Sequence, residues 1–246
     1  MTSEEDLKEA IAFYREALQL LNECGEAYLL GGAFAIRHHT GIFRNTKDLD
    51  VFCKPSQYTR ILKFFADKGY RVELTDSRWL AKVYKDDYFI DVIFNSVSNI
   101  CTVDDSWYQH AVNANYEDIP VKIIAPEELV WCKSYVQNRE RYDGADVNHL
   151  LLRCGKEMDW KRLFARLDQH WHLLLDKLIL FQFTYPGDYR DIIPQWLFDE
   201  LIKRAQEQYA IPASTEKVCL GPLIDNTQYR TDVVEWNYKV FTIKTI

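Results

Sequence analysis

The chain has 246 residues, of which 48% are hydrophobic and 14% aromatic, so it can bury a sizeable core as one large or two modest domains and is not a disordered protein. Its net charge of −7 at pH 7 argues against a broad nucleic-acid surface, although this charge is compatible with a local basic groove. No apolar run approaches the roughly 18 residues of a membrane helix, and the first residues are acidic where a signal peptide is basic. The six cysteines form no C-x-x-C pair. We therefore expect a cytoplasmic protein with reduced thiols.

The first predicted elements are a helix and a short strand. Ile11, Tyr14, Leu18 and Leu21 are separated by steps of three and four, which is typical of an amphipathic helix. An apolar strand is predicted at residues 27–30. We expect the helix to cover this strand and to serve as scaffold.

A glycine pair follows this strand and opens a short helix that ends near Gly41. Gly31 and Gly32 let the backbone come close to an oxyanion, and the helix after them offers free N–H groups and the positive end of its dipole. A glycine pair at such a turn more often serves turn geometry alone. His38 and His39 are adjacent on this helix and point about 100° apart, so they cannot chelate one ion together.

A second strand carries Asp48 and Asp50. Side chains at i and i+2 of a strand point to the same side, about 7 Å apart along the backbone. Such a pair can hold two divalent cations, which lie roughly 3.5–4 Å apart in two-metal sites. The alternative is a solvated strand end. Just before the strand, Arg44 and Lys47 could bind a triphosphate or balance the two carboxylates, and Thr46 is more typical of a turn.

A third carboxylate, Asp91, stands alone in an apolar strand. The turn at 85–87 predicts a hairpin whose second strand contains it. A lone buried carboxylate is costly unless it is paired or bound to metal. A position beside the strand of Asp48 and Asp50 would bring Asp91 to the same cations. After the strand of Asp48 and Asp50, the sequence predicts a helix at 55–68 and strands at 70–74, 79–84 and 88–94, the last of which contains Asp91.

Most of the sequence after Pro126 is predicted to be helical. Pro126 at the first helical position and the acidic Glu127 and Glu128 in the first turn are typical of a helix start. Before it we expect a loop with a short helix at 95–117 and a last strand at 121–124. The prediction is a mixed α/β sheet in a domain at 1–125 and a helical C-terminal domain at 126–246. Its tail from Pro212 lacks a helical period, and 234–243 is a candidate strand.

A polar segment in the helical part allows two interpretations. Asp143 could cap a new helix, with Asp146 closing a capping box. Alternatively, Arg139 or Arg141 lies beside the carboxylates or the triphosphate. Lys133 precedes this segment and, taken alone, is typical of a surface lysine.

Together these motifs resemble the nucleotidyltransferase superfamily, whose core is shared with DNA polymerase β. The similarity is to bacterial stand-alone nucleotidyltransferases: aminoglycoside nucleotidyltransferases, AbiE-type toxin enzymes and a group of unknown function. It covers roughly residues 25–155. The segments that carry it are Gly31-Gly32-Ala33-Phe34-Ala35, Arg44-x-Thr46-x-Asp48-Leu49-Asp50, Asp91, Pro126-Glu127-Glu128-Leu129, Lys133 and residues 139–147.

The resemblance implies an α/β nucleotidyltransferase core, and transfer of NMP from an NTP such as ATP to a hydroxyl acceptor. It implies two Mg²⁺ ions, or Mn²⁺, held by the three carboxylates Asp48, Asp50 and Asp91, the last also serving the acceptor hydroxyl. The implied nucleotide-binding residues are Gly31, Gly32, Arg44, Thr46, Lys47 and Lys133.

The acceptor stays open between a small molecule and a macromolecule, tRNA or protein. A non-catalytic nucleotide-binding or regulatory protein is a further alternative. The three carboxylates are all present, which speaks against that alternative, because a site without turnover would be free to lose one.

Overall fold

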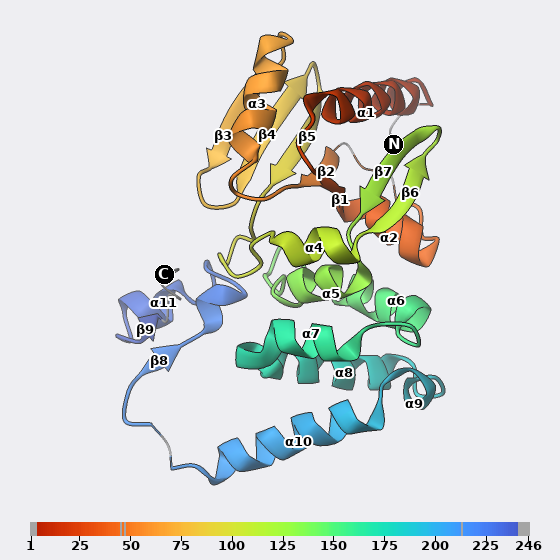
Figure 1. Cartoon of the computed structure of the whole chain (residues 1–246). Helices are drawn as coiled ribbons and strands as arrows, with labels where there is room; N and C mark the ends of the chain where they lie inside the picture. Colours follow the sequence, from red (N-terminus) through yellow and green to blue (C-terminus); the bar gives the residue numbers. More distant parts are fainter. Residues whose placement is uncertain (1–3, 45, 47, 213, 241–246) are drawn as a thin grey trace. The chain divides into compact units, whose positions relative to one another are not determined.

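The computed structural model describes residues 4–44, 46, 48–212 and 214–240. The chain divides into two compact units, Met1–Ala125 and Pro126–Ile246, each of which has its own core (Figure 1). Within the described residues, no helix combines the length and the apolar character that crossing a membrane requires.

The first unit is built on a mixed sheet, which confirms the predicted fold class. Its order is β3-β4-β5-β2-β1-β7-β6, with β2 parallel to β5, β1 parallel to β7 and the other neighbours antiparallel. The strands of the described residues are β1 Leu29–Leu30, β2 Asp48–Phe52, β3 Arg71–Asp76, β4 Leu80–Lys85, β5 Tyr88–Ile93, β6 Val112–Tyr116 and β7 Ile119–Ile123.

Helices α1 and α3 contact each other and pack on this sheet (Figure 1). Strand β2 alternates strictly, with Leu49 and Val51 fully buried and Asp48 and Asp50 on the opposite face. Burying the apolar set against the helices therefore leaves both carboxylates on the other face. The helices of this unit are α1 Glu4–Cys24, α2 Gly32–Thr40, α3 Tyr58–Asp67 and α4 Asp105–His110.

The prediction of a loop at 95–117 is wrong for its last residues, which form β6. This edge strand pairs with β7, and Asn113 and Asn115 alternate with Val112, Ala114 and Tyr116, which is the period of a strand. Its hairpin turn contains Glu117 at φ 52°, a conformation that glycine or asparagine usually marks. The turn residue that usually marks a hairpin is therefore missing from the sequence, although the alternation of the strand is present.

The second unit consists mainly of helices and ends in a tail that contains two short strands. Its elements are α5 Pro126–Ser134, α6 Gly144–Cys154, α7 Trp160–Leu167, α8 Trp171–Thr184, α9 Tyr189–Ile192, α10 Gln195–Ala210, β8 Val218–Cys219, α11 Arg230–Val234 and β9 Lys239–Val240, with 3-10 turns at Asp168–His170 and Gly221–Leu223. The candidate strand at 234–243 is wrong at its start, because Val234 ends a helix; residues 241–243 lie outside the described residues.

Candidate active site

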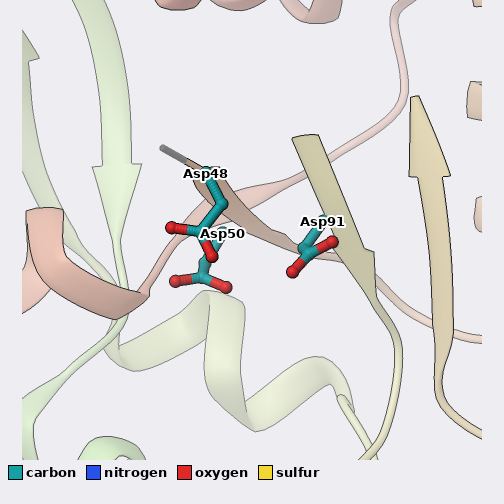
Figure 2. A group of neighbouring side chains, drawn as sticks. All are labelled: Asp48, Asp50 and Asp91. Atoms are coloured by element: carbon teal, nitrogen blue, oxygen red, sulfur yellow. The ribbon is translucent and has the colours of Figure 1, made fainter. Parts of the chain in front are cut away.

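Three carboxylates meet where β2 and β5 run side by side. The register sets Asp50 directly opposite Asp91, with Asp48 two residues earlier on the same face of β2. One oxygen of each lies within 4.8 Å of the others, and all three side chains are partly buried. Figure 2 shows the carboxylates turned toward one another. Within the described residues, this is the one group of three or more side chains placed to hold a metal ion.

The glycine pair lies against Asp50. The amide of Gly31 donates to the backbone oxygen of Asp50 at 3.0 Å, and Gly31 precedes the first residue of α2. A Cβ on Gly31 would lie 2.3 Å from the ring of Phe52, so this turn accepts no larger residue. The turn places the N-terminus of α2 beside the carboxylates, as an oxyanion site there would require.

Thr46 contacts Asp48 from the segment that enters β2. Its hydroxyl donates to the Asp48 carboxylate, and its backbone oxygen accepts from the Tyr14 hydroxyl at 3.4 Å. Burial raises the pKa of Tyr14, and the charges of Asp48 and Asp50 raise it further. Tyr14 is therefore a neutral hydrogen-bond donor beside the carboxylates.

Asp91 has a cationic partner, Lys82, which the sequence analysis did not identify. The Lys82 ammonium forms an ion pair at 2.7 Å with Oδ1 of Asp91. Burial raises the pKa of Asp91, the Lys82 charge opposes this rise, and the nearby charge of Asp48 adds to it. The available signal was the hairpin register, because a turn at Asp86–Asp87 sets Lys82 opposite Asp91.

Arg44 and Thr46 line a hollow of about 540 Å³ between α1, α2 and the β6–β7 hairpin. Its wall includes Tyr14, Phe34 and Tyr116, whose rings meet edge to face at 5.8 and 5.2 Å. The hollow combines a basic side chain with an aromatic wall, and Thr46 connects it to Asp48. Lys47, the remaining predicted residue of this segment, lies outside the described residues.

Lys133 belongs to the second unit and is buried, so its interpretation as a surface lysine is wrong. Its ammonium binds Asp143 at 2.7 Å and Asp146 at 2.8 Å, while Arg141 binds Asp143 at 2.9 Å. Asp143 is the N-cap residue of α6, as one interpretation predicted, but its side chain makes no capping hydrogen bond and binds Lys133 and Arg141 instead. Arg139 donates its backbone N–H to Asp225.

A mixed sheet, a glycine turn into a helix and three carboxylates on adjacent strands define a protein of the nucleotidyltransferase class. The family model described as "Nucleotidyl transferase of unknown function (DUF2204)" matches residues 10–167, which is more than half of the chain. The chain belongs to this family.

Several solved structures are similar to this chain at low identity. The antibiotic-resistance factor ANT(2″)-Ia is 16% identical, with a TM-score of 0.49 over 68% of this chain and 95% of that one. The lincosamide antibiotic adenylyltransferase LnuA, with lincomycin bound, is 17% identical, with a TM-score of 0.41 over 61% and 96%. JHP933 from Helicobacter pylori is 14% identical, with a TM-score of 0.41 over 85% and 99%. These similarities carry no information on the acceptor. The comparison with curated proteins gave no match.

Proposed function

We propose that the protein transfers a nucleoside monophosphate from an NTP to a hydroxyl group of an acceptor, with release of pyrophosphate. The observation that carries the proposal is the convergence of Asp48, Asp50 and Asp91 within 4.8 Å on two adjacent parallel strands of a family member. In this proposal residues 1–125 are the nucleotidyltransferase core domain and 126–246 a helical C-terminal domain.

The residues present fit divalent cations. Three partly buried carboxylates repel one another at this separation, so cations would lower the free energy of the cluster. Carboxylate oxygens are ligands that suit Mg²⁺ or Mn²⁺. Asp48, Asp50 and Asp91 would hold two such ions. When bound, these ions would neutralise charge on the phosphates and ease deprotonation of the acceptor hydroxyl.

The glycine turn and the hollow supply the nucleotide site in this proposal. The backbone N–H groups of Gly32 and the first turn of α2 would receive the leaving pyrophosphate, while Gly31, whose N–H donates to the Asp50 backbone oxygen, would shape the turn. Arg44 and Lys47 would add positive charge, and Thr46 would hold Asp48 in place. The aromatic wall of the hollow offers a surface for the nucleoside.

Asp91 would take the acceptor's proton on a carboxylate oxygen, directly or through a water that it orients. The acceptor oxygen then forms its bond to the α-phosphorus while the bond from that phosphorus to pyrophosphate breaks. Positioning of the two reactants would account for much of the rate.

Lys133 stays a predicted nucleotide contact. Its ion pairs with Asp143 and Asp146 mean that a phosphate there would have to compete with two carboxylates.

The test uses purified protein with Mg²⁺ and each α-labelled NTP in turn, starting with ATP, and a cell lysate as the acceptor pool. Label that moves with the wild type and not with Asp50→Asn supports the proposal. The labelled fraction then identifies the acceptor as small molecule, tRNA or protein. NTP binding without transfer under any NTP would favour a nucleotide-binding regulatory protein, and absence of binding would contradict both.

A further inference from the structure

A lysine shares a cross-strand row with two of the carboxylates. In β4, β5 and β2, the residues Lys82, Asp91 and Asp50 are direct neighbours in register. Side chains at directly opposed positions lie on the same face of a sheet and interact. The charges along this row are therefore one positive and two negative, on the face that carries the proposed cation site.

Two contacts hold the Lys82 side chain. Its ammonium lies 2.7 Å from Oδ1 of Asp91 and 3.9 Å from the centre of the Phe89 ring. The side chains of Lys82 and Asp91 are only 18% and 14% exposed. An ion pair at this depth, with an aromatic ring beside the cation, restrains both partners more than a surface pair does.

We propose that Lys82 is a positioning residue of the cation site: by holding Oδ1 of Asp91, it leaves the other carboxylate oxygen of Asp91 for a divalent cation shared with Asp48 and Asp50. Figure 2 shows the Asp91 carboxylate with one oxygen facing these two residues and the other turned away from them. The inference rests on the metal role of the three carboxylates in the proposed function.

A positive charge near a cation site has two opposite effects. It repels the incoming cation, and it orients the ligand that must receive this cation. Three carboxylates and one ammonium carry a net charge of about −2, which one divalent cation balances, so the repulsion leaves a favourable site. Partners that orient metal ligands typically change the affinity by about 10–100-fold. Orientation is the larger effect here, because Asp91 is mostly buried and Lys82 contacts one of its two oxygens.

The test measures the Kd of Mn²⁺ alone, without nucleotide, by titration calorimetry or electron paramagnetic resonance. Lys82→Met keeps the length of the side chain and removes its charge; we expect Mn²⁺ to bind about tenfold or more weakly. Lys82→Arg should restore most of the affinity, since its guanidinium can donate to the same oxygen. Lys85→Met is the matched control, because Lys85 lies on the same strand but pairs with Glu16. The Kd of Mn²⁺ for this variant should equal that of the wild type.

Mn²⁺ binding by folded Lys82→Met at wild-type affinity or tighter would overturn the inference. If Lys82→Met fails to fold, Lys82→Val tests the same contact, because valine suits a strand and removes the ammonium that lies against Oδ1 of Asp91. A several-fold weaker Kd in that variant supports the inference, and an unchanged Kd contradicts it. Failure of the proposed function is distinguishable: a wild type that binds Mn²⁺ through Asp50 but moves no label would refute transfer alone. A wild type that binds no Mn²⁺ would overturn both.

Discussion

Gly32 leaves no room for a side chain beside Asp50: a Cβ at Gly32 would lie 1.6 Å from Oδ2 of that carboxylate. Gly32 also has φ +50°, a conformation that residues with a Cβ adopt at a cost. The backbone of Gly32, the first residue of α2, is therefore packed directly against the side chain of Asp50. The position of the Asp50 carboxylate depends on the absence of a Cβ at this glycine.

Gly32→Ala should therefore displace the Asp50 carboxylate. We expect the variant to lose at least about 1 kcal/mol of unfolding free energy from the positive φ, with more from the collision. The Kd of Mn²⁺ should rise, because a ligand has moved. Urea unfolding and a Mn²⁺ titration measure the two effects.

Gly41→Ala separates strain from collision. Gly41 has φ +79°, but nothing lies within 4 Å of a Cβ built there. This variant should lose about 1 kcal/mol and keep the wild-type Kd for Mn²⁺. Equal affinity in both variants would show that the close approach of Gly32 to Asp50 has no part in cation binding.

The local part of the site follows from sequence periodicity. Strand alternation predicts that Asp48 and Asp50 share a face, and the apolar context of Asp91 predicts a strand around it. The contact of Lys82 with Asp91 also needs the hairpin register. The pairing of β5 with β2 is a long-range choice between strands, and only the similarity of the whole motif to a known superfamily pointed to it.

The second unit shows where local rules fail. Lys133, Asp143 and Asp146 follow patterns typical of a surface lysine and a capping box, yet they form a buried cluster between α5 and α6. Capping preferences describe one helix at a time, whereas this cluster depends on the packing of two helices. Nothing in the spacing of the three residues distinguishes the two outcomes.

Arg162→Met should strongly destabilise the second unit. Arg162 on α7 binds Glu127 at 2.5 Å and also binds Glu128, whose side chain is fully buried. Removing it leaves Glu128 with Arg166, 3.7 Å away, as a weaker partner, and Glu127 with the backbone N–H of Asp159. Loss of one member of a buried pair costs about 3–5 kcal/mol. Chemical unfolding should give a cost in this range.

The matched control for Arg162→Met is Lys63→Met, which removes the exposed i,i+4 pair with Asp67. That pair is worth about 0.3–0.5 kcal/mol. Similar costs for the two variants would mean that the buried network adds little to stability.

Asp143→Asn tests the buried cluster through pH. Burial on its own raises the pKa of Asp143, but Arg141 and Lys133 together outweigh it and hold that pKa below its usual value. The folded chain then binds fewer protons at this site than the unfolded chain, so the ionised group stabilises the fold above about pH 4. This stability is lost as the pH falls through the lower, folded-state pKa.

The quantity to measure for Asp143→Asn is the difference in unfolding free energy between wild type and variant at several pH values. It should be largest near neutral pH and shrink below about pH 4. The exposed Asp67→Asn serves as control, with a small loss of stability at neutral pH because its ion pair with Lys63 is exposed. A difference for Asp143→Asn that does not change with pH would contradict the stated direction of the pKa shift.

Thr46→Val tests whether Asp48 is held for cation binding. The Thr46 hydroxyl donates to the Asp48 carboxylate, and valine has nearly the same shape without this donor. A loss of about 1 kcal/mol or less in stability is expected, as for one hydrogen bond. The Kd of Mn²⁺ should rise several-fold, because Asp48 loses a group that orients it. Thr46→Ser keeps the hydroxyl and should bind Mn²⁺ like the wild type. Equal weakening in both variants would assign the effect to the lost methyl group and its packing, and would refute a role for the hydroxyl.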